Sequence, residues 1–246
     1  MDESGYCINL YDVDLKRWVY SDPIVCNVRY TLFSADTSNL LYIISKDLNA
    51  TLYSFDLGSS SEAILYRTTY GGGSNNYDAG ISNLRWSPTG RYLTFEVYSG
   101  IMGGTLNSLF VMDWADRDYF VVSAPDTYYA SYYPVWSADD AWFALIMQDE
   151  YVSSGFVPLT NHQGDVYLVN AQSGEEYRLT YTPAVPEIDL RWAEDDQIAF
   201  TELTRQTFQF SIEQAMDIPV TPPEQIVEPP PYREEYLSRG ASNILI

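Results

Sequence analysis

Two pairs of neighbouring carboxylates have the clearest potential for chemistry in this sequence. Asp139 and Asp140 follow Trp136, and Asp195 and Asp196 follow a second tryptophan fifty-odd residues later. Two carboxyl groups that face each other across a sugar can serve as the acid and the base, or the acid and the nucleophile, of glycoside cleavage. Both pairs, however, lie in short polar turns, where an aspartate side chain often accepts a hydrogen bond from the backbone two residues later. The sequence therefore favours a structural role over catalysis.

Other catalytic patterns are weaker still. Ser74 lies in a glycine-rich stretch, but the Gly-x-Ser-x-Gly elbow of a serine hydrolase is not complete there. His162 is the one histidine and lies in a polar stretch, and no cysteine–histidine cluster has the spacing of a zinc site. Asp113 and Asp116 lack the oxygen-ligand pattern of a calcium loop. We therefore expect no catalytic residues, no metal and no cofactor, and interpret the chain as non-catalytic.

The carboxylate pairs belong to a phrase that occurs four times: an aromatic residue, a short polar turn and an apolar run. The aromatic residues recur at intervals of about 50 residues, a period typical of repeat architectures. They are Phe33, Trp86, Trp136 and Trp192. Each copy divides into four short strands, and residues 92–97 and 166–169 alternate as half-buried strands do. Four antiparallel strands in a unit of this length are typical of one β-propeller blade.

The run from Trp86 to Phe95 (WSPTGRYLTF) resembles the repeat of TolB-type, WD40-like (PD40-type) propellers, and residues 165–180 resemble the second half of that repeat. The resemblance covers about residues 6–210. Thr89 replaces the usual aspartate, and Phe33 replaces the usual tryptophan. The resemblance implies a propeller in which the four aromatic residues are buried between neighbouring sheets. Because this family includes both periplasmic binding proteins and propeller domains of oligopeptidases, the resemblance says little about activity.

The predicted fold is all-β and propeller-like, with about four four-stranded antiparallel blades in residues 1–212. The chain begins inside a blade, because residues 6–14 and 16–20 have the pattern of a third and a fourth strand. Residues 188–212 supply a first, a second and a candidate third strand, so the halves could pair into one composite blade that closes a ring. The alternative is an incomplete or fragmentary propeller. Residues 213–246 are rich in proline and predict an extended or disordered tail.

Charge and cysteines limit the partners and the compartment. The chain has 34 acidic and 13 basic residues, which disfavours nucleic acid and anionic membranes and would suit a basic partner. No apolar run is long enough to span a membrane. We expect an extracytoplasmic protein if an upstream signal sequence is missing, and otherwise a cytoplasmic one. Cys7 and Cys26 could form a disulfide or remain as buried thiols.

Partner recognition is expected on one side of the blades. In an up-and-down blade the connections alternate between two sides, and the three long predicted loops, residues 69–80, 98–107 and 148–164, share one of them. Tyrosine provides a large amphipathic contact area, so we expect these loops to bind a protein or peptide. The candidate binding residues are Tyr70, Asn76, Tyr77, Asp78, Tyr98, Met102, Tyr129, Tyr151 and Phe156. Self-association is expected if the ring is open. The alternative function is a propeller domain or fragment that accompanies an oligopeptidase-like hydrolase or a glycan-active protein.

Overall fold

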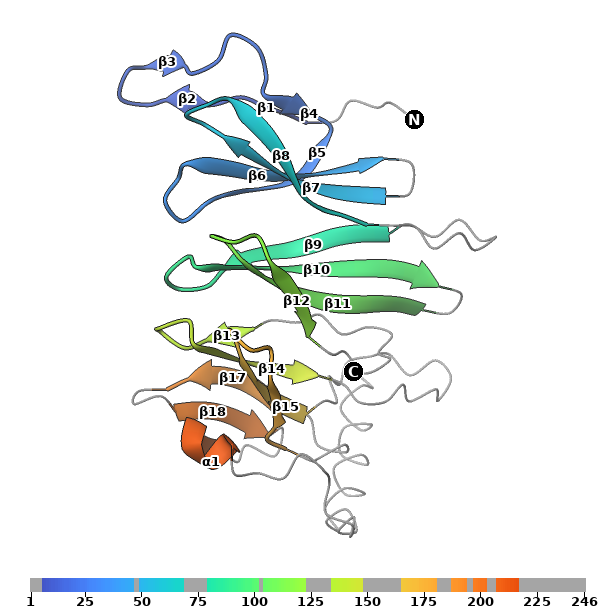
Figure 1. Ribbon diagram of the computed structural model, residues 1–246, viewed down its shortest axis with the longest axis vertical. Coiled ribbons are helices and arrows are strands. Elements are labelled where there is room, and N and C mark those ends of the chain that lie inside the picture. The colour runs from blue at the N-terminus through green and yellow to red at the C-terminus, as the bar shows by residue number, and fades with distance from the viewer. Residues whose placement is uncertain are drawn as a thin grey trace, which may run out of the picture. The chain divides into compact units, whose positions relative to one another are not determined.

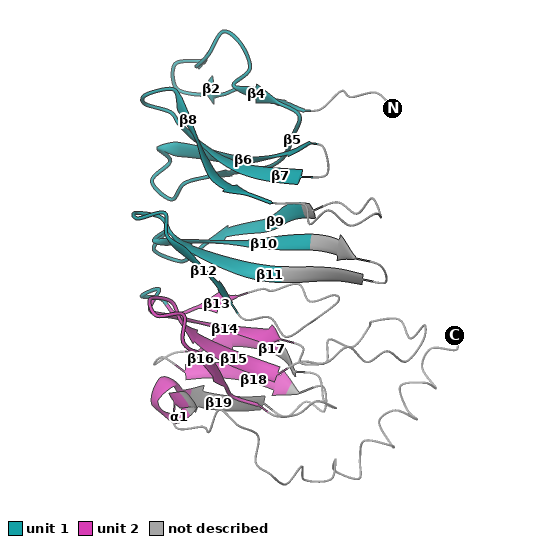
Figure 2. Ribbon diagram, turned by 45° about the vertical axis from the view of Figure 1, so that its right-hand side comes forward, with its two compact units in different colours: residues 1–131, 138–140 teal, residues 132–137, 141–246 magenta. Residues whose placement is uncertain are grey.

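Antiparallel strands make up almost all of the described structure, a computed structural model (Figure 1). The structure describes residues 6–46, 49–68, 79–101, 104–122, 134–147, 165–180, 187–193, 197–202 and 207–216. The chain divides into two units (Figure 2). Unit 1 comprises residues 1–131 and 138–140, and unit 2 comprises residues 132–137 and 141–246. No helix among the described residues is long and apolar enough to cross a membrane.

Unit 1 contains two four-stranded sheets, in which each strand pairs with its neighbours in sequence. The first sheet consists of β5 (Val28–Phe33), β6 (Asn39–Lys46), β7 (Asn49–Asp56) and β8 (Ser61–Arg67). The second consists of β9 (Ala79–Trp86), β10 (Tyr92–Ile101), β11 (Gly104–Asp113) and β12 (Tyr119–Val122). All of these pairings are antiparallel, so both sheets are the up-and-down units that the repeat predicts.

Unit 2 contains a third four-stranded sheet and a three-stranded one. The four-stranded sheet consists of β13 (Val135–Trp136), β14 (Trp142–Met147), β15 (Asp165–Asn170) and β16 (Glu176–Arg178). The three-stranded sheet consists of β17 (Glu187–Trp192), β18 (Gln197–Glu202) and β19 (Thr207–Ser211). Helix α1 (Ile212–Met216) follows directly.

Helix α1 lies at the predicted boundary between the propeller and the tail, as a single short helix from Ile212 to Met216. The Ser211 hydroxyl accepts a hydrogen bond from the Gln214 N–H at 3.2 Å, and the Gln214 side chain accepts one from the Ser211 N–H at 3.0 Å. This reciprocal pair is a capping box, which satisfies the first donors of a helix. Ile212 packs against the apolar cluster of unit 2. Residues 217–246 lie outside the described residues.

The turn between the first and second strands is built the same way in each four-stranded sheet. It begins with a serine whose hydroxyl oxygen accepts the N–H of the residue five positions later, at 2.9, 3.0 and 2.9 Å for Ser34, Ser87 and Ser137. The N–H of each serine donates to the carbonyl of that same residue. The repeated aromatic–serine phrase therefore specifies a closed turn by local hydrogen bonds alone.

The turn between the third and fourth strands is also repeated. It starts with Asp or Asn, whose side chain accepts a backbone N–H two or three residues later, and the residue four positions later has a positive φ. The side-chain acceptors are Asp12, Asp56, Asp113 and Asn170. The matching positive-φ residues are Lys16, Ser60, Arg117 and Gly174, with φ of 51°, 56°, 65° and 71°. The first of these four turns lies at the N-terminus, before the first complete sheet.

Residues 6–26, here called the N-terminal hairpin, contain β1 (Cys7–Ile8), β2 (Tyr11–Asp12), β3 (Arg17–Trp18) and β4 (Val25–Cys26). β1 pairs with β4, and β2 pairs with β3. Tyr11 lies opposite Trp18, which is the register of the third and fourth strands in the complete sheets. The corresponding pairs there are Phe55 and Glu62, Met112 and Tyr119, and Val169 and Glu176. The hairpin therefore has the register of the outer half of a blade, that is, of a third and a fourth strand.

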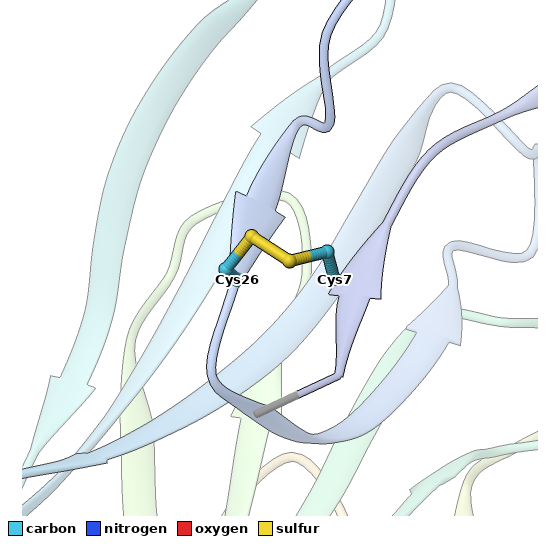
Figure 3. Close-up of a disulfide and its surroundings, with 2 residues drawn as sticks. All are labelled: Cys7 and Cys26. Atoms are coloured by element: carbon cyan, nitrogen blue, oxygen red, sulfur yellow. A yellow bond between two sulfur atoms is a disulfide. The ribbon is translucent and has the colours of Figure 1, made fainter. Parts of the chain in front are cut away.

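A disulfide joins Cys7 to Cys26, which face each other across β1 and β4 with a Cα–Cα distance of 3.9 Å (Figure 3). Both cysteines are exposed, so the alternative of two buried thiols is wrong. The two cysteines are the only ones in the chain. Disulfides persist in oxidising compartments and are rare in the reducing cytosol.

Apolar packing holds the sheets of each unit together. In unit 1, Leu41 and Ile43 of the first sheet lie in one cluster with Leu93 and Phe95 of the second. A second cluster joins the N-terminal hairpin to the other face of the first sheet, through Ile8, Ile24, Val25, Leu40 and Tyr42. In unit 2, residues of β14 and β15 pack with residues of β18. These clusters follow from the alternation of apolar side chains along the second and third strands.

The four repeated aromatic residues are less buried than predicted. The Trp86, Trp136 and Trp192 side chains are half-buried, and Phe33 is 43% exposed. The indole N–H of Trp86 donates to the Phe33 carbonyl at 2.6 Å, and that of Trp192 donates to the Val135 carbonyl at 2.5 Å. A tryptophan therefore contacts the first strand of the preceding sheet. Phe33 is exposed because the hairpin that precedes its sheet has no first strand among the described residues.

The candidate third strand predicted near the C-terminus is confirmed. It is β19, which pairs with β18 over five residues. Closure of a ring through a composite blade stays a prediction.

Candidate binding surfaces

The two ends of the sheets in unit 1 differ in one connection, because a single long segment, residues 69–78, lies at one of them. Tight turns join the strands at one end, at residues 34–38, 57–60, 87–91 and 114–118. The strand ends that flank residues 47–48, 69–78 and 102–103 lie at the opposite end, because successive connections of an up-and-down sheet alternate. The longest of these segments, residues 69–78, contains four of the candidate binding residues. The topology therefore agrees with the predicted assignment of residues 69–78 to one side.

The predicted loop 98–107 is wrong in its structure, because most of it is strand. β10 continues to Ile101 and β11 begins at Gly104, so these residues form a long hairpin. Tyr98 pairs with Gly80 of β9, and the tyrosine ring lies so close to the glycine that a Cβ there would overlap it. Tyr98 is half-buried as a result. The sequence predicted a loop here because residues 99–104 contain serine and several glycines, and glycine is depleted in strands.

The remaining candidate binding residues lie outside the described residues and stay predictions. They are Tyr70, Asn76, Tyr77, Asp78, Met102, Tyr129, Tyr151 and Phe156. The same is true of Asp195, Asp196 and His162. Tyr98 is therefore the one candidate for which the structure gives a position.

Asp140 is the carboxylate with the clearest role. It is part of unit 1, is 1% exposed and has a φ of 60°. It accepts the Ser87 hydroxyl at 2.5 Å and the Thr89 N–H at 3.2 Å, and it also accepts the Thr89 hydroxyl. Asp139, its neighbour, is exposed. The two carboxylates thus differ in environment, and Asp140 accepts the donors of the polar turn that contains Ser87 and Thr89.

Carboxylates in the other turns are held by local donors. The hydroxyl of Ser34, then the N–H and the hydroxyl of Ser38, lower the pKa of Asp36 to about 2. The N–H and the hydroxyl of Ser59 lower the pKa of Asp56. Hydrogen bonds to a carboxylate favour its ionised form, which is the form that closes these turns. Because the pKa of each is lowered, the Asp36 and Asp56 carboxyl groups stay ionised near neutral pH.

Buried polar groups are paired in the strands. Arg178 forms an ion pair with buried Asp165, which also accepts the Thr180 hydroxyl at 3.1 Å. The Tyr42 hydroxyl donates to Glu62, and burial, followed by this contact, raises the pKa of Tyr42. On the surface, Arg91 pairs with Asp113 at 3.1 Å. Within the described part of the chain, no three His, Cys, Asp or Glu side chains gather as metal ligands.

Sequence reasoning missed an apolar surface on the N-terminal hairpin. Half of the large apolar side chains that are exposed among the described residues lie on it: Tyr6, Tyr11, Val13, Leu15, Trp18 and Val19. Tyr11 and Trp18 pack edge to face, with ring centroids 5.2 Å apart. The signal was present, since apolar residues alternate with charged ones here. It could only be interpreted once the described strands were seen to place no second strand beside the hairpin.

Comparison with known proteins supports the fold. No family model matches the sequence, and no curated protein matches it. Among solved structures, the chain is similar to TolB from Acinetobacter baumannii (12% identity, 84% of this chain, 49% of that chain, TM-score 0.41). It is similar to the β-propeller domain of the Trilobed protease from Pyrococcus furiosus (9% identity, 85% of this chain, 65% of that chain, TM-score 0.49). It is also similar to the acylaminoacyl peptidase from Pyrococcus horikoshii (12% identity, 82% of this chain, 33% of that chain, TM-score 0.50).

The likeness extends to the fold and to part of each neighbour. The chain spans less than two thirds of the length of these proteins. Up-and-down four-stranded sheets with repeated turns, together with the likeness at a TM-score of 0.50, identify a partial β-propeller. Identities of 9–12% are too low to carry activity or ligand from those proteins to this one.

Proposed function

We propose that this protein is a non-catalytic binding module of the TolB-like propeller kind, which recognises a protein or peptide through the side that bears the longer connections. The observation that carries the proposal is the asymmetry of the sheets in unit 1. At one end, serine and aspartate side chains are used within the tight turns themselves. The other end bears the longest connection between strands of unit 1, residues 69–78, which contains two tyrosines and two asparagines, and these residue types suit a recognition surface.

The chemistry of the described carboxylates supports a non-catalytic role. A glycosidase needs one carboxyl group with a raised pKa as the acid and a second, ionised one beside it. Asp140 is engaged by Ser87 and Thr89, and the pKa of Asp36 is lowered. These groups act as acceptors in turns, which is a stabilising function.

The competing function is a propeller domain that accompanies a hydrolase or a glycan-active protein. The observation that favours it is the likeness to the Pyrococcus horikoshii peptidase, of which this chain covers 33%. The two functions differ in one measurable property. A binding module leaves chromogenic peptide and glycoside substrates intact, and turnover of either by the purified chain would refute the non-catalytic proposal.

Substitutions on the two sides of the sheets test where a partner binds. A partner is first isolated by affinity capture, and its dissociation constant is then measured for Tyr77→Ala, Tyr98→Ala, Tyr129→Ala and Tyr151→Ala. An aromatic anchor should weaken binding by about 1–3 kcal/mol when it is truncated. Thermal unfolding of each variant identifies any that misfold, which matters most for Tyr98 because its ring packs on Gly80.

Matched controls come from the tight turns. Asp116 and Gln172 are exposed residues of turns between third and fourth strands. Asp116→Ala and Gln172→Ala should leave the dissociation constant unchanged. If they weaken binding as much as the tyrosine substitutions do, in folded protein, the partner does not bind through the longer connections.

A further inference from the structure

One sequence motif of the first sheet is not explained by the repeat. Asn49, Ala50 and Thr51 form an Asn-x-Thr sequence, which is the acceptor motif for N-linked sugars. No other asparagine of the chain is followed two positions later by serine or threonine. Because short motifs also occur by chance, the place of Asn49 in the fold has to decide whether the motif can be used.

Asn49 lies at the end of a hairpin. It is the first residue of β7 and pairs with Lys46, the last residue of β6 (Figure 1). The Asn49 side chain is half-buried, and Lys46 is exposed. A sugar chain is bulky and needs a surface position, which the end of a hairpin provides. A sugar on Asn49 can therefore extend away from the sheet into solvent.

The four-stranded sheet of unit 2 shows that Asn49 departs from the repeat. In both sheets the N–H of the next residue donates to a threonine hydroxyl, at 2.7 Å for Ala50 and 2.9 Å for Val166. Asn49 and Asp165 therefore occupy the same position. Asp165 is 2% exposed and forms an ion pair with Arg178, whereas Asn49 is more exposed. The first sheet thus has a neutral, more accessible side chain where the other sheet buries a charge.

Thr51 limits the time at which a sugar can be attached. It is 8% exposed, and its hydroxyl oxygen accepts the Nε–H of Arg67 at 3.3 Å. A transferase that recognises the threonine cannot reach it in the paired sheet. Arg67 belongs to β8 and follows Thr51 by 16 residues, so the threonine stays accessible until β8 has been synthesised and paired. Attachment must therefore precede the pairing of β7 with β8.

The disulfide is a second, independent observation. Cys7 and Cys26 are joined in the same unit that contains Asn49. Disulfides persist in oxidising compartments and in secreted proteins, and N-linked sugars are also found on secreted proteins. The redox environment that the disulfide requires and the environment that the modification requires therefore agree.

We propose that Asn49 is a site of N-linked glycosylation, with a lipid-diphosphate-linked oligosaccharide as the donor. In the transfer, Nδ2 of Asn49 forms a bond to the anomeric carbon of the first sugar, and the bond from that carbon to the diphosphate breaks. The lipid diphosphate leaves, and one amide proton passes to a base of the transferase. This modification does not depend on the proposed function, since Asn49 is not among the candidate binding residues.

The protein isolated from its natural source gives the first test. Trypsin cleaves after Lys46 and Arg67, so residues 47–67 form one peptide in which Asn49 is the only asparagine. We expect mass spectrometry to find most of this peptide with an attached oligosaccharide. Peptide-N-glycosidase should remove the sugar and convert Asn49 to aspartate. An unmodified Asn49 in this protein would overturn the proposal.

Variants test whether the motif directs the transfer. The full chain, behind a cleavable secretory leader, is synthesised with microsomes that contain the transferase, and a loss of gel mobility that the glycosidase reverses reports the sugar. Thr51→Ser should keep the sugar, whereas Thr51→Ala and Asn49→Gln should lose it. Asn39→Gln, which changes an asparagine of β6 outside the motif, should leave transfer unchanged. Transfer that persists in Thr51→Ala would refute the assignment.

The folded chain tests the order of events. Protein that is added to the microsomes after folding, with its disulfide formed, should remain unmodified, because Thr51 is then buried. Modification of folded and nascent chains to the same extent would contradict this order. The glycosylated chain should still form the bridge between Cys7 and Cys26 and show the circular dichroism of the unmodified protein. If it does not, the sheet cannot accommodate a sugar at Asn49 and the proposal is wrong.

Discussion

Asp140 shows how a buried carboxylate can hold the polar turn of Ser87 and Thr89. It accepts hydrogen bonds from Ser87 and Thr89 while 1% exposed. Asp140→Asn tolerates the positive φ but replaces one acceptor oxygen by an amide donor, which then faces other donors. We expect the free energy of unfolding to fall by about 1–3 kcal/mol in urea denaturation. Asp116→Asn, in an exposed turn, should change it by less than about 0.5 kcal/mol. Equal effects would contradict a buried structural role.

Gly90 is fixed by two independent constraints. Its φ is 78°, and a Cβ at this position would overlap the Cβ of Ala35 in the preceding turn. Gly90→Ala should therefore lower the free energy of unfolding by at least about 1–2 kcal/mol. At Gly58, φ is not positive and a Cβ would lie 3.4 Å from the Asp56 carboxylate, an ordinary contact. Gly58→Ala should change stability by less than about 1 kcal/mol, and a loss equal to that of Gly90→Ala would contradict the steric argument.

The turn carboxylates predict a dependence of stability on acid pH. The pKa of Asp36 is lowered from 3.8 to about 2 by the Ser34 hydroxyl and by the N–H and hydroxyl of Ser38. A carboxylate with a lowered folded-state pKa stabilises the fold above its unfolded pKa, and this contribution is lost as pH falls through the folded value. Asp36→Asn should therefore flatten the decline in melting temperature between pH 4 and pH 2, measured by calorimetry. An unchanged slope would show that Asp36 does not contribute.

The roles of residues that bond to near neighbours in the sequence could be predicted. The environment of residues that depends on distant strands could not. The serine and aspartate turns were predictable because their hydrogen bonds join residues two to five positions apart. Phe33 was not, because its exposure depends on the sheet before it, and the described residues of that sheet include no first strand. Tyr98 was assigned to a loop because glycine and serine follow it, whereas pairing with β9 and β11 extends the strand.

At the scale of elements, the N-terminal hairpin depends on its disulfide. The two cysteines are 19 residues apart, and a bridge that closes a loop of about this length stabilises by about 2–4 kcal/mol. Replacing both cysteines by serine should lower the stability of the hairpin by that amount, measured by amide exchange of Ile8 and Val25. Wild-type protein treated with a reductant should behave in the same way. If exchange is unchanged in both, packing against the first sheet alone holds the hairpin.

Element types were easier to predict than element ends. Four antiparallel strands per repeat were evident from the apolar runs and the turns between them, and the structure has that order in three sheets. The disulfide was left open, because a sequence cannot show that two cysteines lie opposite each other on paired strands. The short helix α1 forms beyond the predicted propeller because its capping box and the packing of Ile212 add to a weak local tendency.

At the scale of the whole molecule, one repeated unit accounts for the described structure. Three sheets contain all four strands, the C-terminal sheet contains three, and the N-terminal hairpin contains the outer two. The serine turn recurs in the three four-stranded sheets, and the turn with a positive-φ residue recurs in those sheets and in the hairpin. The unit also explains the exposed residues, since Phe33 and Tyr11 both lie where an inner half-blade would cover them.

Amide hydrogen exchange of four residues tests this account most directly. Leu57, Trp114 and Ala171 donate their N–H groups to a second strand, and Val13 is the equivalent residue of the hairpin. In the purified protein without a partner, Val13 should exchange at close to the unprotected rate, at least about a hundredfold faster than the other three. If Val13 is protected as strongly as Leu57, Trp114 and Ala171, a second strand covers the hairpin and the half-blade assignment is wrong.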